Sequence, residues 1–400
     1  MPVFPAPAVS KPAAPATTPS NKAPMPLVPF TRAARAKSML IGQYGPYTLG
    51  AAQIPLPAVQ VRPAGFLARL VLKVVGTTAG NAANVAFQND APFNVLQQIA
   101  FLSPQQDTIL SSIDGFTLAM VNKYFALGSG FVDPLATPFF KKTTGAGATG
   151  GSFAYKAVIP LEVDSRDAFG VLKNMAANTQ FILNLQLNTL ANLYSTAPTS
   201  APTVTVTASM EYYSAPAPTN TEGYPQATEP YGAGSLSLLQ TQTPLIVPST
   251  QQSFQLVGVG NTIRAIMYIL RDAAGVRSEV DWPTTTNLIV NNDLYFYKEK
   301  DLWRAQMAQE YGITGGLAAT PTLNTLDNGV FILTDFMNSG ESGNTRIDGA
   351  SNRNRYLVTG TGTSLYTEAV NWGANANSVL VVENVIKPSS AQALYAPQLD

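Results

Sequence analysis

The chain has 400 residues, contains neither histidine nor cysteine, and is 46% hydrophobic but only 12% charged. The missing residue types exclude a histidine-dependent triad, a cysteine nucleophile and a His/Cys zinc site. Average soluble proteins carry roughly 25% charged residues, about twice the proportion found here. A surface with so little charge favours a chain that buries much of it in an assembly.

The net charge is zero, but the charges are unevenly distributed. Eight basic residues and no acidic one precede Asp90, so residues 1–89 carry +8; the remainder, with 16 basic and 24 acidic groups, carries −8. Residues 1–40 hold nine of the 30 prolines and predict an extended Pro/Ala-rich basic arm. The arm is either an idle tail or a segment that orders against a neighbour or a lipid surface, with Arg32, Arg35 and Lys37 as headgroup contacts.

Neither membrane insertion nor secretion is indicated. No apolar run approaches the length of a transmembrane helix, and the N-terminus lacks the basic-then-apolar pattern of a secretory signal.

From residue 47 onward the pattern is mostly that of β-strands. Apolar and polar residues alternate along 66–74, 181–188 and 203–212. This period of two, with Gly, Pro, Asn or Thr at the boundaries, predicts antiparallel sheets covered on one face. A helix is predicted from the cap residue Asp114 through Leu127 to Gly128.

The second half repeats this order of elements. The strand 263–270 corresponds to 66–74, and a helix from Asp301 to Gly312 corresponds to the one that begins at Asp114. Three later strands follow their counterparts at 174 or 175 positions: 330–334 corresponds to 155–161, 355–359 to 181–185, and 378–385 to 204–211.

Composition divides the chain. Residues 214–234, with four prolines and three glycines, have the character of a linker. The expected parts are an arm at 1–40, a first unit at 41–215, a linker at 216–234, a second unit at 235–390 and a tail at 391–400. Long antiparallel runs with few short helices predict an all-β fold of two tandem β-sandwiches of the jelly-roll type.

Three features could carry chemistry. The GxGxxG spacing at 145–150 is followed by a strand-like segment, which predicts a surface loop and not a dinucleotide turn. Glu162, Asp164 and Asp167 could act as acid and base or bind calcium, but we expect the first two on one strand face and Asp167 as a helix cap. The aromatic residues at 295–297, with Trp303, could stack a sugar or a base, but such a cluster in a β-rich chain predicts core or subunit interface.

The stretches 61–87, 93–128 and 159–189 resemble the double jelly-roll major capsid proteins of tectivirus-type bacteriophages, which are tailless and contain a membrane and double-stranded DNA. The likeness lies in the type and order of elements and covers about residues 45–390. It implies a homotrimer whose six rolls form a nearly hexagonal capsomer of an icosahedral shell, with no cofactor and no reaction.

The same resemblance implies partners and a location. The partners would be neighbouring capsomers, the minor capsid, penton and membrane proteins of the virion, and the internal lipid membrane. The chain would be made in the cytoplasm of a bacterial host and end in the virion capsid. No basic groove interleaved with aromatic residues predicts a specific nucleic-acid partner.

Two other functions stay open. A virion spike or receptor-binding jelly roll that recognises a glycan would need an exposed site of aromatic and carboxamide side chains. A polysaccharide-active enzyme on a β-sandwich would use carboxylates such as Glu162 and Asp164.

Overall fold

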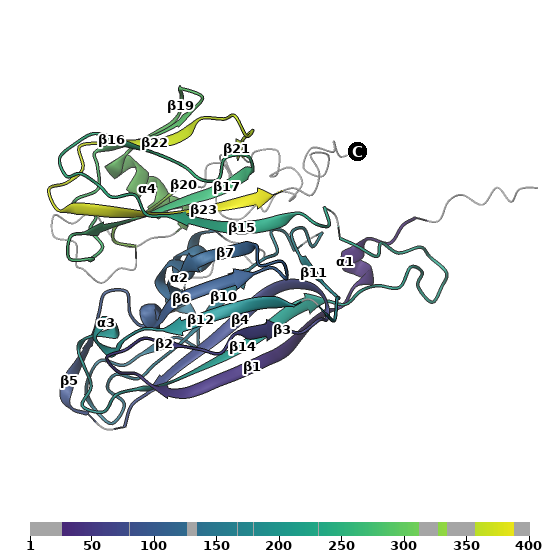
Figure 1. The fold of residues 1–400 in the computed structure, drawn as a ribbon, viewed down its shortest axis with the longest axis horizontal. Coiled ribbons are helices and arrows are strands. Elements are labelled where there is room, and N and C mark those ends of the chain that lie inside the picture. The colour runs from purple at the N-terminus through teal and green to yellow at the C-terminus, as the bar shows by residue number, and fades with distance from the viewer. Residues whose placement is uncertain are drawn as a thin grey trace, which may run out of the picture.

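Two β-rich bodies, one from each half of the chain, lie on top of each other in the computed structural model (Figure 1). The structure describes residues 26–79, 81–125, 134–165, 167–178, 180–230, 232–311, 327–333 and 357–387. The predicted tail at 391–400 and residues 1–25 of the predicted arm lie outside these ranges. Among the described residues, no helix is both long and apolar enough to cross a membrane.

The first body is a sandwich of two four-stranded antiparallel layers. One layer has the order β1 (Ala36–Thr48), β14 (Thr203–Tyr213), β4 (Gly65–Thr77), β10 (Phe153–Pro160). The facing layer has the order β2 and β3 (Ile54–Pro55, Val59–Val61), β12 (Phe181–Leu187), β6 (Leu96–Leu102), β7 (Thr108–Ile113). Short strands extend these layers or form a small third sheet: β5 (Asn81–Phe87), β8 (Lys141–Lys142), β9 (Gly145–Gly147), β11 (Leu172–Asn174), β13 (Tyr194–Thr196).

The second body has the same strand order. One layer runs β15 (Leu236–Gln242), β23 (Ala376–Lys387), β17 (Thr262–Asp272), β20 (Val330–Leu333). The other runs β16 (Gln252–Gln255), β22 (Leu365–Val370), β18 (Thr285–Val290), β19 (Asp293–Glu299). In each body the first strand lies beside the last strand of the same body, which is the strand order of a jelly roll. The predicted pair of tandem jelly rolls is therefore confirmed.

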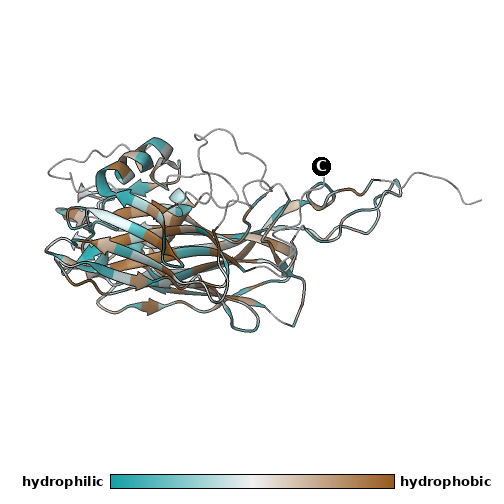
Figure 2. Cartoon of the chain, turned by 90° about the horizontal axis from the view of Figure 1, so that it is seen from above, coloured by the Kyte–Doolittle hydropathy of each residue, from teal (hydrophilic) through white to brown (hydrophobic). Residues whose placement is uncertain are grey.

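The core follows from the alternation seen in the sequence. Along β14 the side chains of Val204, Val206, Ala208 and Met210 are buried, and the residues between them are half-buried. Brown apolar and teal polar residues alternate along many of the strands in Figure 2. All three stretches with a period of two are strands, namely β4, β12 and β14.

Each long helix follows the last strand of its second layer. Helix α2 (Gly115–Tyr124) begins as predicted, and the Asp114 carboxylate accepts a hydrogen bond from the Thr117 backbone N–H at 2.7 Å. Helix α4 (Lys300–Tyr311) begins one residue before the predicted start. The predicted ends at Gly128 and Gly312 lie outside the described residues. The sequence did not indicate the short helices α1 (Phe30–Ala33) and α3 (Leu190–Leu193).

One of the proposed correspondences between the halves is wrong. The strand predicted at 355–359, described from Leu357 as β21 (Leu357–Val358), pairs with the start of β17, as β11 pairs with the start of β4. The counterpart of β12 is β22, because it lies between β16 and β18 just as β12 lies between β3 and β6. The loops between corresponding strands differ in length in the two rolls, so corresponding strands are not separated by a constant number of residues. Residues 334, 355 and 356 of the predicted strands lie outside the described residues.

A second prediction fails after β10. That strand ends at Pro160, so Glu162 and Asp164 do not share a strand face. Asp167 accepts a hydrogen bond from the Phe169 backbone N–H at 3.1 Å within a turn and caps no helix. Ala168 has φ +58° and Gly170 has φ +87°, and this left-handed backbone cannot continue a right-handed helix.

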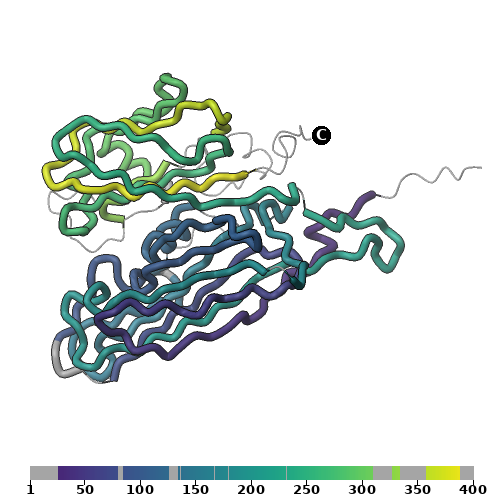
Figure 3. The backbone as a smooth tube through the Cα atoms, viewed as in Figure 1, coloured from purple at the N-terminus to yellow at the C-terminus, as the bar shows by residue number. Residues whose placement is uncertain are grey.

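Between β14 and β15 the chain leaves the first roll and returns to start the second (Figure 3). This segment lies beside the N-terminal residues, since Val28 bridges Gln226 and its carbonyl accepts from the Ala227 N–H at 3.0 Å. β1 begins at Ala36, inside the stretch that composition assigned to the arm.

Candidate assembly surfaces

The two rolls are joined through a sheet. Strand β7 at the edge of the first roll lies parallel to β15 at the edge of the second, and they bridge at Leu110 and Leu239. The resulting ten-stranded sheet runs from β2 through both rolls to β20. Leu110 and Leu239 are 1% and 3% exposed, so this contact is desolvated. Such a sheet fixes the position of one roll beside the other.

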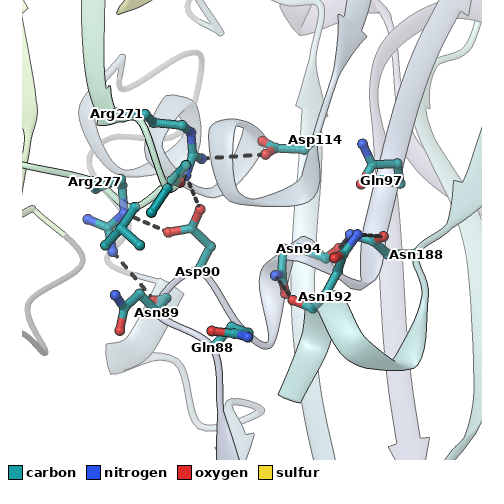
Figure 4. Close-up of a pocket in the computed structure, with 13 residues that line it drawn as sticks. Gln88, Asn89, Asp90, Asn94, Gln97, Asp114, Asn188, Asn192, Arg271 and Arg277 are labelled. Atoms are coloured by element: carbon teal, nitrogen blue, oxygen red, sulfur yellow. Dashed lines mark hydrogen bonds and ion pairs between the residues drawn. The ribbon is translucent and has the colours of Figure 1, made fainter. Parts of the chain in front are cut away.

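Buried ion pairs reinforce one end of the junction (Figure 4). Asp90, from the first roll, accepts from Arg277 Nε at 2.6 Å and from Arg271 Nη1 at 2.7 Å. Arg271 also lies 3.9 Å from the carboxylate of Asp114, and the Arg277 guanidinium lies over the ring of Phe116 at 4.4 Å. The two arginines belong to the second roll, so the cluster ties the rolls together across the junction.

The charges of this cluster are balanced locally. Burial alone would raise the pKa of Asp90, but the two guanidinium groups outweigh it and lower that pKa. Burial raises the pKa of Asp114, and Arg271 only partly offsets this. Asp90 therefore stays ionised and gives the arginines their counter-charge, without which two buried cations would oppose the contact.

A cavity of about 350 Å³ opens beside the cluster and is lined largely by carboxamides. These side chains mainly hold local backbone: Asn94 donates to the Asn192 carbonyl at 2.7 Å, and Asn188 donates to the Asn94 carbonyl at 3.0 Å. Asn192 donates in turn to the Asn188 side chain at 2.8 Å. The amide-rich wall is therefore structural support for the turn before β6 and for α3.

A second charged cluster joins the helices. Lys123 of α2 donates to both carboxylate oxygens of Asp327 at 2.7 and 3.0 Å, and the Tyr124 hydroxyl donates to the same group. Arg304 of α4 forms a two-point pair with Glu279 at 3.0 and 2.7 Å and donates to the Asp327 carbonyl at 3.2 Å. The first roll's helix is thus attached to the second roll.

Within the part of the chain that the structure describes, the outer edges of the two rolls are open. There, β1 has a single strand neighbour, β14, and β19 has a single neighbour, β18. Both edges expose apolar side chains, with Leu40 57% exposed on β1, and Leu294 58%, Tyr295 46% and Tyr297 59% exposed on β19. Open strand edges with apolar side chains are surfaces for pairing with another chain.

The predicted contact residues of the arm lie at the start of the first roll. Arg32 lies in α1, Lys37 in β1 and Arg35 between them, and all three residues are exposed. Phe30 anchors this stretch: it is 4% exposed and meets the rings of Phe66 and Tyr213 edge-on at 5.0 and 6.0 Å. Because Phe30 packs into the first roll, the backbone that carries Arg32, Arg35 and Lys37 is held in place against that roll.

The candidates for chemistry do not form a common site. Glu162 is 2% exposed, accepts from the Tyr213 hydroxyl at 2.7 Å, and has its pKa raised by burial. Within the described ranges no group of three acidic residues is arranged to hold a metal ion. The GxGxxG segment holds the short strand β9 and is followed by a strand, as predicted.

The aromatic group separates into two parts. Trp303 is 2% exposed and packs in the core of the second roll against Phe331, with ring centroids 5.0 Å apart. Tyr295 and Tyr297 are exposed on β19. The sequence missed the junction residues altogether, because Asp90 and Arg277 are 187 positions apart and no motif links them.

Comparison with known proteins places the fold. No protein-family model matches the sequence, and no curated protein matches it. The STIV MCP, from Sulfolobus Turreted Icosahedral Virus, superposes with a TM-score of 0.59 at 13% identity, covering 90% of this chain and 99% of that one. The PBCV-1 virus capsid gives 0.55 at 10% identity, covering 90% and 97%. The major capsid protein of bacteriophage PM2 gives 0.50 at 8% identity, covering 89% and 99%.

This chain is a double jelly roll. The superpositions cover 89–90% of this chain and 97–99% of each compared chain, so the likeness includes both rolls. At 8–13% sequence identity, this similarity shows a shared fold and nothing finer.

Proposed function

We propose that this chain is a major capsid protein whose trimers form the capsomers of a virion shell. The observation that carries the proposal is the fixed placement of two rolls of identical strand order through one continuous sheet. A ring of three such chains contains six similar rolls, and its nearly hexagonal outline tiles a surface. Repeated head-to-tail contacts between identical chains form a closed ring when the rotation from each chain to the next adds up to a full turn.

The composition supports a shell. With only 12% charged residues, lateral contacts between capsomers form without desolvating many charges. The comparison structures include a major capsid protein of a bacteriophage and a virus capsid, which supports the same role here. The chain then acts in the virion and needs no cofactor and no catalytic reaction.

The finer parts of the proposal concern the type of virus. A tectivirus-type phage made in bacterial cytoplasm would surround its DNA with an internal membrane. Arg32, Arg35 and Lys37, exposed at the start of the first roll, would then face lipid headgroups or a neighbouring protein. Other partners would be adjacent capsomers and the penton, minor capsid and membrane proteins.

Native mass by light scattering, with negative-stain images of the same peak, tests the proposal. Three chains of 42.4 kDa amount to about 127 kDa. We expect a particle of that mass with a nearly hexagonal outline. A monomer of 42.4 kDa would contradict the proposal and direct attention to glycan recognition by the exposed Tyr295 and Tyr297.

A further inference from the structure

The junction inside one chain is a contact between two kinds of strand edge. It joins the last strand of one layer in the first roll, β7, to the first strand of a layer in the second roll, β15. Among the described strands, the same two kinds of edge have no further strand beside them at the far ends of the molecule. β19 takes the place of β7 in the second roll, and β1 takes the place of β15 in the first. Figure 1 shows β1 along the bottom of the molecule and β19 at its top.

The register of this repeated contact can be derived from irregularities that both rolls share. β6 and β7 shift register between Ile99 and Phe101 and again between Phe101 and Leu102, and β18 and β19 shift once, between Leu288 and Ile289. The second shift of β6 and β7 is the one beside the turn that joins the two strands, as is the shift of β18 and β19, so these two shifts correspond. Leu110 is paired with Phe101, and Phe296 is paired with Leu288. Phe296 is therefore the counterpart of Leu110.

The same reasoning locates the counterpart of Leu239. In each roll the pairing between the central strand and the last strand skips one residue of the central strand. The skipped residue is Ala68 in β4 and Arg264 in β17. Next to this irregularity, Glu211 pairs with Ser38 of β1, and Asn384 pairs with Leu239 of β15. Ser38 is therefore the counterpart of Leu239.

We propose that β19 of one copy pairs in parallel with β1 of the next copy, with Phe296 opposite Ser38, as Leu110 is opposite Leu239 within the chain. The contact rests on the proposed capsomer and names the surface that closes it. It is head-to-tail, so each copy uses β19 toward one neighbour and β1 toward the other.

The exposed groups on the two edges fit each other. Counted in parallel from the pair of Phe296 and Ser38, the exposed Leu294 lies opposite Ala36, and the exposed Tyr297 lies opposite Met39. Leu40, on the same face of β1 as Ser38, lies opposite Lys298. In a parallel register Arg35, three residues before Ser38, lies near Asp293, three residues before Phe296; both are exposed. The pairing therefore buries apolar surface at its centre and places opposite charges at one end.

The absence of native cysteine makes cross-linking a direct test. A chain with Ser38→Cys and Phe296→Cys is oxidised, or treated with a short bismaleimide, and run on a denaturing gel. We expect covalent dimers and trimers. As a matched control, Ser38→Cys is combined with Val247→Cys, at an exposed position away from both edges, and should stay monomeric on the gel. Ser38→Cys with Tyr297→Cys is a second pair that leaves the half-buried Phe296 intact.

The outcomes separate the contact from the capsomer. A native mass near 127 kDa without cross-linking by either pair would overturn the strand pairing and leave the capsomer standing. A native mass of 42.4 kDa for the unmodified chain would overturn the proposed function itself.

A second measurement is the concentration at which the trimer half-dissociates. We expect Leu40→Lys to raise it about 10-fold or more, because the added charge lies opposite Lys298 across the contact. Val247→Lys, at a position 58% exposed against 57% for Leu40, should leave it unchanged. Equal effects of the two variants would contradict the proposed pairing.

Discussion

Arg277 of the second roll donates through Nε to Oδ1 of Asp90 in the first roll at 2.6 Å, across 187 positions of sequence. Its side chain is 2% exposed and that of Asp90 is 12% exposed, so both charges have lost most of their water. The pair, shared with Arg271, is the electrostatic link between the rolls.

Removing the acid of this link should be costly. Asp90→Ala leaves Arg271 and Arg277 buried without their counter-charge, and we expect a loss of about 3–5 kcal/mol in the free energy of unfolding, measured in urea. The matched control is Glu229→Ala, which breaks an exposed pair with Lys173 of the same 2.6 Å length and should cost less than about 1 kcal/mol. Similar losses for the two variants would show that the cluster does not hold the junction.

Glu383 should make stability depend on pH. The carboxylate is fully buried and accepts from the backbone N–H groups of Val257 and Gly258 at 2.8 and 2.9 Å. Burial outweighs these donors and raises its pKa from 4.5 to about 7. The folded chain therefore holds a proton that the unfolded chain releases, so this contribution to stability is complete below the unfolded pKa and is lost as pH rises through 7.

We expect the free energy of unfolding to fall between about pH 5 and pH 8, by at most about 1.4 kcal/mol per pH unit. Glu383→Gln should flatten this slope whatever its own fixed cost, and the exposed Glu222→Gln should leave it unchanged. Asp90, whose pKa is lowered, affects stability with the opposite sign. Its contribution to the free energy of unfolding is lost as the pH falls through the acid range, below the window in which Glu383 acts. A slope that persists in Glu383→Gln would assign it to another group.

The strands were predictable where one face of a sheet is buried. β14 alternates so regularly because its inner side chains meet the core and its outer ones do not. The capped start of α2 was predictable because Asp114 acts on its own neighbour, Thr117. Strand alternation and helix capping each depend on residues that are close together in the sequence, so a short stretch of sequence is enough to predict them.

What failed depended on distant or conformational detail. The counterpart of β12 was misassigned because two-residue strands such as β21 carry no periodic signal. The turn at Asp167 depends on the left-handed backbone of Ala168, which a residue with a Cβ rarely adopts. The junction cluster unites residues from two rolls, and a single sequence does not indicate which distant charges meet.

Gly115 should tolerate no side chain. A Cβ at this first residue of α2 would lie 2.1 Å from the Phe93 carbonyl oxygen, a backbone atom that cannot rotate away. We expect Gly115→Ala to lower the free energy of unfolding by about 1–3 kcal/mol despite the higher helix propensity of alanine. Gly50→Ala, where a Cβ meets nothing within 4 Å, should change it by less than about 0.5 kcal/mol. A stabilised Gly115→Ala chain would mean that the 3-10 turn at Phe93–Val95 yields easily.

Phe30 should control the attachment of the arm. Replacing it with alanine empties the space between Phe66 and Tyr213, so α1 should detach while the rolls stay folded. Limited trypsin digestion followed by mass spectrometry should then show faster cleavage after Arg32 and Arg35. Leu27→Ala, at a side chain already 61% exposed, should digest like the unmodified chain. Equal rates for all three would show that other contacts hold α1.

The basic groups beside this anchor should bind anionic lipid if the shell lines a membrane. Each basic residue near an anionic surface contributes about 1 kcal/mol, so Arg32→Glu should weaken binding to phosphatidylserine-containing vesicles by roughly 5-fold or more. Arg35 and Lys37 are left unchanged because both lie in the proposed subunit contact. Lys156→Glu, which reverses an exposed charge elsewhere on the first roll, is the matched control. Cosedimentation at low and at physiological salt measures the effect, since binding by charge weakens as screening increases. If the control loses as much binding, the attraction is one of general charge; if the unmodified trimer does not bind, the exposed basic groups serve a protein neighbour instead.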